Sequence, residues 1–313
     1  MTAYLVQRLL AVIPVLLLVG LITFALLRVT PGDPAAVLAG EHATPENVER
    51  IRQQLGLDRP LHVQLWRWFG RLLQGDLGDS LFTGYKVTTL IRQRLEPTLS
   101  LAVLAEIIAI ALALPMGILA AWKANSWVDR AVMVFAVLGF SIPVFWLGFN
   151  LIWLFSVTLD LLPPAGYTPL SQGVWPWLRS LILPAVTLGL IFSALIARMT
   201  RASMLEILRE DYIRTARAKG LAEKVVLLRH ALRNAAVPIV TIIGLGFAAL
   251  VTGVVVTETV FALPGLGRLI VDSMLRRDYP VIQGAILLAA SAYVVINLIV
   301  DLTYAYFDPR IRY

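Results

Sequence analysis

Two carboxylates stand out because of the apolar sequence around them. Glu106 is the only charged residue within residues 98–122, and Glu258 directly follows the uncharged residues 234–257. A carboxylate among apolar residues is costly, and it tends to face a cavity that water can reach. Glu106 is therefore a candidate for lining a pathway, and Glu258 is a candidate for a gate. A structural hydrogen bond would explain Glu106 as well, and loop structure would explain Glu258.

Small and hydroxyl-bearing residues in the same kind of apolar sequence are further candidates for lining a route. They are Ser141, Asn150, Thr252 and Gly253. Helices that pack together within a membrane also use such residues at their contacts. Helix packing is therefore the alternative explanation for each of the four.

The sequence shows no arrangement of residues that is typical of covalent, acid–base or metal chemistry. The chain has no cysteine, and its three histidines (His42, His62 and His230) do not have the spacing of metal ligands. The apolar stretches contain no paired His, Asp or Glu residues of the kind that an intramembrane enzyme needs. We therefore predict no catalytic residues and no metal site, and we expect a protein that is not an enzyme.

Six stretches are long and apolar enough to cross a membrane as helices. The hydrocarbon core is about 30 Å thick, which takes roughly 20 apolar residues. The stretches are residues 9–27, 98–122, 131–159, 180–197, 234–257 and 279–300. The first is too long for the apolar core of a signal peptide, so we expect an uncleaved span, and residues 131–159 are long enough to span with tilt or with an interfacial end. The sequence predicts an all-α integral membrane protein with six transmembrane helices.

The distribution of basic residues predicts how these helices are oriented. The chain has 27 Lys and Arg residues against 20 Asp and Glu residues, and the excess lies beside apolar stretches rather than on a basic face for nucleic acid. If the N-terminus is cytoplasmic, the inside segments hold 14 of the basic residues and the two short outside loops hold 4. Because cytoplasmic loops are enriched in Lys and Arg, we predict that both termini are cytoplasmic.

Residues 30–97 are expected to form a structured region outside the membrane. Thr44 is a plausible N-cap with Pro45 at the first helical position. Further on, Leu65, Trp66, Trp68, Phe69 and Leu72 form an apolar stripe with helical spacing. The stripe indicates a helix that lies on the membrane surface or on neighbouring helices, and a surface for an extracytoplasmic partner is the alternative.

Residues 198–234 are expected to form a helical hairpin on the cytoplasmic side. The segment holds nine basic and four acidic residues. Two helical stripes run along it: Met204, Leu205, Leu208, Tyr212 and Thr215, and then Leu221, Val225, Leu228 and Leu232. Gly220 lies between them, where a residue with positive φ would end the first helix. A purely solvated basic loop is the alternative, but such a loop gains nothing from Leu and Val at helical spacing.

Several motifs together resemble the permeases of ABC importers, in the dipeptide, oligopeptide and nickel branch of that family. The motif in the hairpin is YIRTARAKGL at residues 212–221. The others are TPGDP at 30–34, SIPVF at 141–145, HALRN at 230–234 and ETVFALPGLG at 258–267. The resemblance extends over nearly the whole chain and implies the architecture of a type I ABC importer permease.

The resemblance also implies which residues couple the chain to an ATPase. The general family pattern is Glu-Ala-Ala, three residues, Gly, nine residues and Ile-x-Leu-Pro. With Gly220 as the anchor, only Ala216, Gly220 and Leu232 match, and position 214 carries no carboxylate. The implied coupling residues are Tyr212, Arg214, Thr215, Ala216, Arg217, Ala218, Lys219, Gly220 and Leu221. Of these, Ala216 and Ala218 would allow close approach of the ATPase, and Arg214, Arg217 and Lys219 would meet its carboxylates.

The partners that the resemblance implies are a second related permease, two ATP-binding subunits and an extracytoplasmic substrate-binding protein. The sequence contains no G-x-x-x-x-G-K-[ST] phosphate loop, so ATP and Mg²⁺ would be bound by the partner ATPases and this chain needs no cofactor. Short peptides are the expected cargo, with nickel or another small solute as the alternative. A secondary transporter that works without ATP, and an exporter, are the competing classes.

The expected organisation has three parts. Residues 1–29 form the N-terminus and the first span, residues 30–97 form the extracytoplasmic region, and residues 98–313 form the permease core with the coupling loop 198–234. The expected location is the inner membrane of a bacterium, which the chain crosses several times.

Overall fold

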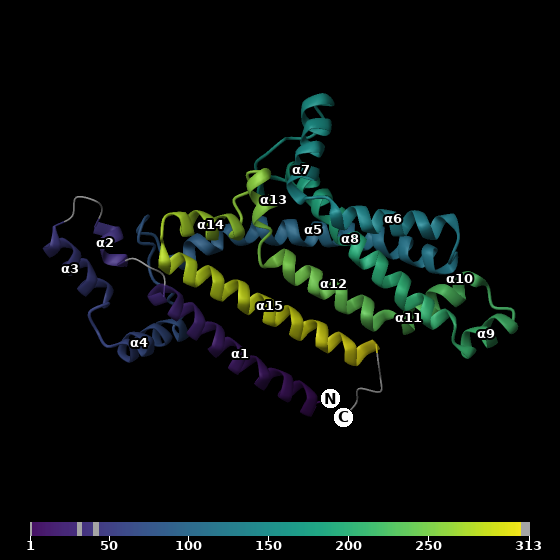
Figure 1. Cartoon of the computed structure of the whole chain (residues 1–313), viewed down its shortest axis with the longest axis horizontal. Coiled ribbons are helices and arrows are strands. Elements are labelled where there is room, and N and C mark those ends of the chain that lie inside the picture. The colour runs from purple at the N-terminus through teal and green to yellow at the C-terminus, as the bar shows by residue number, and fades with distance from the viewer. Residues whose placement is uncertain (1, 30–32, 40–43, 308–313) are drawn as a thin grey trace.

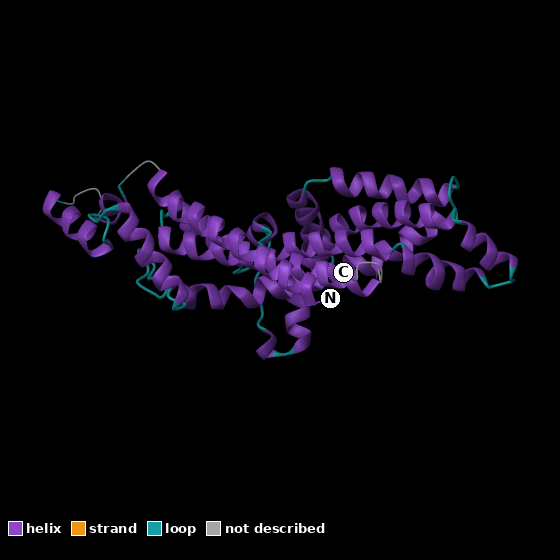
Figure 2. Cartoon of the chain, turned by 90° about the horizontal axis from the view of Figure 1, so that it is seen from below, coloured by secondary structure: helices purple, strands orange, loops and turns teal. Residues whose placement is uncertain are grey.

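The apolar stretches form helices, as expected for backbone groups that find no water in hydrocarbon. The computed structural model describes residues 2–29, 33–39 and 44–307, and these residues form helices, loops and one isolated antiparallel bridge between Asp79 and Lys86 (Figures 1 and 2). The longer helices are α1 (Thr2–Val29), α3 (Pro45–Leu55), α4 (Leu61–Leu73), α5 (Val87–Trp122), α6 (Trp127–Ser141), α7 (Val144–Ile152), α8 (Val174–Leu208), α9 (Asp211–Ala218), α12 (Ala236–Val251), α14 (Leu266–Leu275) and α15 (Tyr279–Phe307). The short elements are α2 (Pro34–Ala39), the π-helical η1 (Trp153–Thr158), the 3₁₀ turn η2 (Leu170–Gln172), α10 (Glu223–Val225), the π-helical η3 (Val226–Ala231), α11 (Leu232–Asn234) and α13 (Val255–Val260).

The helices form an elongated bundle whose two ends differ. Helices α2, α3 and α4 lie at one end, and α9, α10 and α11 lie at the other (Figure 1). Helix α1 runs along α15, and α15 packs against α12. The side-chain amide of Gln283 in α15 donates to the Thr23 carbonyl of α1 at 3.0 Å. This bond ties the outer layer of the bundle together near the end that carries α4.

Helices α5 and α8 make the most extensive contact in the bundle. A Cβ atom on Gly117 would lie 2.8 Å from the Ala197 carbonyl oxygen, and one on Gly189 would lie 2.7 Å from the Ile108 side chain. Both glycines therefore allow the helix backbones to approach more closely than any larger residue would, which is how helices associate in membranes. Helix α6 packs on the other side of α8, where Arg201 forms an ion pair with Asp129.

The six expected spans are not all single straight helices. Helices α5, α8 and α15 are each long and apolar enough to cross a membrane, and the count rises to five when each of two bent pairs is taken as one span. The described part of α1 contributes a shorter apolar helix, Leu10–Ala25. A total of six spans remains a prediction.

The third expected span, residues 131–159, is broken in the middle. The helix axis turns by 98° between α6 and the helix that begins at Val144, and α7 projects away from the bundle (Figure 1). The cause is Pro143, which restricts the residue before it to extended backbone, and Ile142 has φ −78° and ψ 125°. A single tilted span through residues 131–159 is therefore wrong.

The fifth expected span also ends early. Helix α12 stops at Val251, and Gly253 has φ +110° before α13 begins. A Cβ atom on Gly253 would lie 3.1 Å from the Gly267 backbone. Gly253 is therefore required by this turn and by the close approach of Gly267, which agrees with packing rather than with a pathway.

The predicted helix after Thr44 is confirmed. The Thr44 hydroxyl accepts from the Asn47 N–H, Pro45 is the first residue of α3, and Gly56 ends the helix with φ +68°. Residues 30–32 of the TPGDP motif lie outside the described residues. The stripe that begins at Leu65 belongs to α4, where Trp68 meets Phe24 of α1 with ring centroids 5.8 Å apart.

A loop from α4 to α5 is fastened to the start of α15. Ser80 donates a hydrogen bond to the buried Asp278, and the Leu81 N–H donates to the other carboxylate oxygen at 3.0 Å. Arg276 lies 5.1 Å from the centre of the Phe82 ring. These contacts hold the loop over the turn between α14 and α15.

The close contact of α5 and α8 leads to a prediction about stability. Replacing Gly117 with Ala should destabilise the chain by about 1–3 kcal/mol, because the added methyl group meets backbone on α8. The matched control is Gly70→Ala in α4, where a Cβ atom would meet nothing within 4 Å. Thermal melting of the two purified variants in the same detergent should show a lower midpoint for Gly117→Ala alone. Equal midpoints would contradict the close packing.

Candidate functional site

The hairpin formed by residues 198–234 grows directly out of α8. Helix α8 continues to Leu208, Arg209 and Glu210 make a short break, and α9 follows from Asp211. Gly220 then has φ +75°, and its N–H donates to the Arg217 carbonyl at 2.9 Å. This left-handed turn favours glycine because other side chains are strained there. The prediction that Gly220 separates two helical arms is confirmed.

The buried side chains of the hairpin differ in part from those predicted. Its core contains Met204, Ile213, Ala216, Val226, Leu227 and Ala231. The predicted stripe residues Tyr212, Leu221, Val225 and Leu228 are exposed instead. The break at Arg209 and Glu210 restarts the helix with a different phase, and the π-helical η3 shifts the second arm because a π turn holds an extra residue. The predicted stripes are therefore wrong from Tyr212 to Leu228, whereas Leu232 packs against the hairpin core as expected.

Two of the arginines that were expected to meet an ATPase have carboxylate partners within the hairpin. The Arg217 guanidinium group forms two hydrogen bonds with Glu223, at 2.7 and 3.2 Å, and so joins the two arms. Arg214 contacts Asp211, one helical turn earlier, at 3.1 Å. An exposed pair of this kind stabilises by about 0–1 kcal/mol. Arg217 is therefore exposed but paired within the hairpin, and Lys219 is exposed at its tip.

One of the expected coupling residues is buried, and the others are exposed. Ala216 is buried against the hairpin core, so it does not lie where a partner would approach. The exposed residues are Tyr212, Arg214, Thr215, Arg217, Ala218, Lys219, Gly220 and Leu221. Partial burial raises the pKa of the Tyr212 phenol above its ordinary value, against the opposing effect of Asn234. The phenol is therefore neutral at physiological pH.

Glu106 lies between helices without a hydrogen-bond partner. Its side chain is 6% exposed, and neither carboxylate oxygen has a partner among the described residues. A Cβ atom on Gly246 of α12 would lie 3.7 Å from one of these oxygens and 3.2 Å from the Phe192 ring of α8. An unpaired carboxylate is costly in such a place.

No group of three or more His, Cys, Asp or Glu residues in the described part of the chain could hold a metal ion.

Glu258, in contrast, has a complete set of partners. It is fully buried, and it accepts a hydrogen bond from the Thr98 hydroxyl and another from the Arg268 N–H, each at 2.8 Å. The Thr98 hydroxyl accepts in turn from the Leu266 N–H at 2.8 Å. A Cβ atom on Gly265 would lie 2.0 Å from the carboxylate, so only glycine fits there. Glu258 joins α13 to α5 and to the start of α14, which favours loop structure over a gate.

The other pathway candidates bond to their own helices. The Ser141 hydroxyl donates to the Val137 carbonyl at 2.8 Å, and the Thr252 hydroxyl donates to the Ala249 carbonyl at 3.1 Å. The Asn150 amide donates to the Trp146 carbonyl at 2.7 Å. Thr98, the partner of Glu258, lies eight residues before Glu106 on α5, which corresponds to a rise of about 12 Å along the helix. The candidates therefore do not form one cluster.

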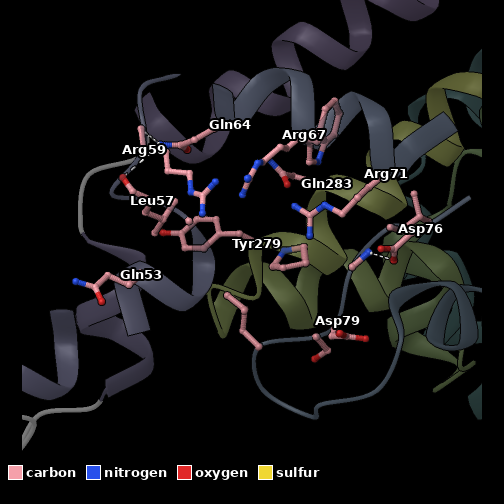
Figure 3. Close-up of a pocket in the computed structure, with 17 residues that line it drawn as sticks. Gln53, Leu57, Arg59, Gln64, Arg67, Arg71, Asp76, Asp79, Tyr279 and Gln283 are labelled. Carbon is pink, nitrogen blue, oxygen red and sulfur yellow. Dashed lines mark hydrogen bonds between the residues drawn. The ribbon is translucent and has the colours of Figure 1, made fainter. Parts of the chain in front are cut away.

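A cavity that the sequence analysis did not anticipate lies between α4 and the start of α15. Its volume is about 620 Å³. Arg59, Arg67 and Arg71 point into it beside Tyr279 and Gln283 (Figure 3). The spacing of Arg67 and Arg71 places both on one helix face, which was the available signal. The contribution of α15 could not be foreseen, because more than two hundred residues separate Arg71 from Tyr279.

Comparison with known proteins agrees with this architecture. Residues 113–313 match the family of the binding-protein-dependent transport system inner membrane component, and residues 1–102 match its N-terminal family. A probable peptide ABC transporter permease protein of Sinorhizobium fredii is 51% identical over the full length of both chains. A putative peptide transport system permease protein of Brucella abortus is 50% identical, and the glutathione transport system permease protein GsiC of Salmonella paratyphi A is 46% identical, again over both full lengths.

A solved structure shows the same fold. A chain of the MetNI methionine ABC transporter in an inward-facing conformation superposes with a TM-score of 0.59 at 19% identity. The match covers 71% of this chain and 97% of that chain. The all-α fold is therefore that of a type I ABC importer permease. The family models and the full-length relatives show that the protein is a transport component rather than an enzyme. The chain belongs to the family of the binding-protein-dependent transport system inner membrane component.

Proposed function

We propose that this chain is one of two permease subunits of an ATP-driven importer for short peptides. The observation that carries the proposal is the continuity of α8 with the hairpin, because one helix of 35 residues joins the interior of the bundle to an exposed helix at its end. The cargo follows from relatives that match over the full length and are named for the transport of peptides and of glutathione, itself a tripeptide.

The exposed face of α9 is the proposed contact with an ATPase subunit. Tyr212, Thr215 and Ala218 lie on it, followed by Lys219 and Leu221 near the tip. The pair between Arg217 and Glu223, together with the buried Ile213, keeps the hairpin in one shape. Exposed ion pairs contribute little, so movement of the ATPase would be transmitted by packing of this rigid helix.

In the proposed orientation, the chain spans the inner membrane of a bacterium and the hairpin lies in the cytoplasm. The first turns of α1 and the last turns of α15 lie toward the bundle end that carries the hairpin (Figure 1). This arrangement supports two termini on the cytoplasmic side, together with the excess of Lys and Arg in the hairpin. Helices α2, α3 and α4 would then face the substrate-binding protein outside.

Glu106 is the proposed polar contact along the route of the cargo. Its carboxylate oxygens have no partner in the described part of the chain, although they lie deep among α5, α8 and α12. A carboxylate at this depth would attract the positively charged amino terminus of a peptide. The second permease subunit would complete the route, and ATP with Mg²⁺ would bind to the two ATPases.

Contact through the exposed face of α9 is tested by co-purification. A tagged chain with Ala218→Trp should lose the ATPase subunits but keep the second permease, because the added ring blocks close approach at an exposed position. The matched control is Ala124→Trp in the exposed turn between α5 and α6. Mass spectrometry of the complex drawn from native membranes measures the outcome. Full recovery of the ATPases with Ala218→Trp would move the contact elsewhere.

The two carboxylates should respond differently when each is changed to Gln. Glu106→Gln should lower ATP-dependent peptide uptake into proteoliposomes by about tenfold, equivalent to about 1.4 kcal/mol, without lowering the melting temperature. Glu258→Gln should lower the melting temperature instead, because hydrogen bonds to a charged group contribute about 1.5–3 kcal/mol.

The same assay tests the cargo. Uptake of a labelled tripeptide should require ATP and the binding protein, and unlabelled peptides should compete with it while free amino acids and nickel salts do not.

Normal uptake with Glu106→Gln would remove that residue from the route. Uptake without ATP would contradict the proposed importer itself.

A further inference from the structure

The cavity between α4 and α15 has the chemistry of an anion site. Three guanidinium groups, those of Arg59, Arg67 and Arg71, point into the same space (Figure 3). No carboxylate lies within ion-pair distance of these three groups among the residues that the structure describes. Unpaired guanidinium groups that converge on a cavity of about 620 Å³ are arranged to hold an anion from several sides.

The two acidic residues of the cavity wall form no ion pair with the arginines. Asp76 accepts a hydrogen bond from the Gly78 N–H at 2.9 Å, so it is held by its own loop. Asp79 lies across the cavity from Arg59 and Arg67 (Figure 3). The lining, with three arginines against two aspartates, therefore carries a net positive charge.

A second observation also indicates a missing ligand. Tyr279 lines the cavity and is only 7% exposed, yet its buried hydroxyl has no hydrogen-bond partner among the described residues. Buried hydroxyl groups almost always have a partner. An oxygen of a bound anion would provide the acceptor that this hydroxyl lacks.

The cavity lies at the level of a membrane surface. Tyr279 begins α15, whose apolar residues 279–300 rise by about 33 Å, close to the roughly 30 Å of the hydrocarbon core. Gln283, one turn further, bonds to Thr23 of α1. The floor of the cavity is thus at the boundary between hydrocarbon and lipid headgroups, on the side opposite the hairpin.

Helix α4 has the features of a helix that lies in this boundary. Arg67 and Arg71 face the cavity, whereas Trp66 and Leu73 are 74% and 88% exposed on another face of the helix. Trp68 and Phe69 contact α1 at Phe24 and Gly20. A helix with an apolar face toward lipid and arginines on its polar face is typical of an interfacial helix.

We propose that this cavity binds the phosphate group of an anionic phospholipid. Planar guanidinium groups match the oxygens of a phosphate in pairs, Tyr279 adds a donor, and Trp66 and Leu73 give α4 exposed apolar side chains on a neighbouring face. Free phosphate offers the same chemistry, so the source has to be separated by experiment. The inference does not depend on the proposed cargo.

The test measures lipid binding to the complete permease complex, purified in a neutral detergent. Native mass spectrometry and thermal melting are recorded with dioleoyl phosphatidylglycerol, with dioleoyl phosphatidylcholine and with inorganic phosphate. We expect phosphatidylglycerol to remain bound and to raise the melting midpoint, with at least tenfold weaker effects of the other two. The double variant Arg67→Gln/Arg71→Gln should lose most of this preference. The control variant Arg50→Gln/Arg92→Gln removes the same charge from exposed positions outside the cavity and should keep it.

Two further variants keep the test decisive if the double variant folds poorly. Arg59→Gln and Tyr279→Phe should each weaken binding of phosphatidylglycerol while the melting midpoint without lipid stays that of the unmodified chain. Equal lipid binding by the double variant and its control would overturn the proposal. A response to inorganic phosphate alone, without a response to phosphatidylglycerol, would overturn it as well. None of these readouts requires transport, so they are independent of the importer assay.

Discussion

The rest of the structure depends on the close packing of α5 against α8. Gly117 and Gly189 bring the two backbones together along a contact that begins near the hairpin and extends past Glu106. In lipid there is no hydrophobic drive between helices, so small residues and close packing must hold them. Helix α8 continues from this contact into the first arm of the hairpin, so the proposed displacement of α9 would reach the interior of the bundle through α8. In the proposed mechanism, the hairpin and the buried carboxylate of Glu106 therefore belong to one mechanical unit.

Charge has a local role within this unit. Arg217 closes the hairpin on Glu223, Arg201 joins α8 to Asp129 of α6, and Glu258 connects α13 to Thr98 of α5 and to the start of α14. Each of these pairs fixes one element relative to its neighbour. Glu106 and the three arginines beside Tyr279 have no ion pair among the residues that the structure describes, and these are the charges for which we propose ligands.

Much of the helical framework was predictable from the sequence, because apolar length, the Thr44 cap and the turn at Gly220 are properties of neighbouring residues. The bend at Pro143 was not predicted, although proline restricts its predecessor, because an apolar run of 29 residues also fits one tilted span. The buried face of the hairpin was mispredicted because the break at Arg209 and the π-helical turn shift the helical phase. The basic cavity depends on contact between α4 and α15. Thr98, one of the partners of Glu258, lies more than a hundred positions away from it in the sequence. Such contacts leave no local pattern.

Insertion of two glycines between Arg209 and Glu210 tests the central account most directly, because it uncouples α9 from α8 while leaving both helices intact. The assembled complex would be reconstituted in proteoliposomes, and peptide uptake and ATP hydrolysis measured together, with the same insertion after Ala124 as the control. The account predicts that hydrolysis continues while uptake per ATP falls strongly, and that the control retains both. Unchanged uptake per ATP in the Arg209 insertion would contradict transmission through a rigid α8.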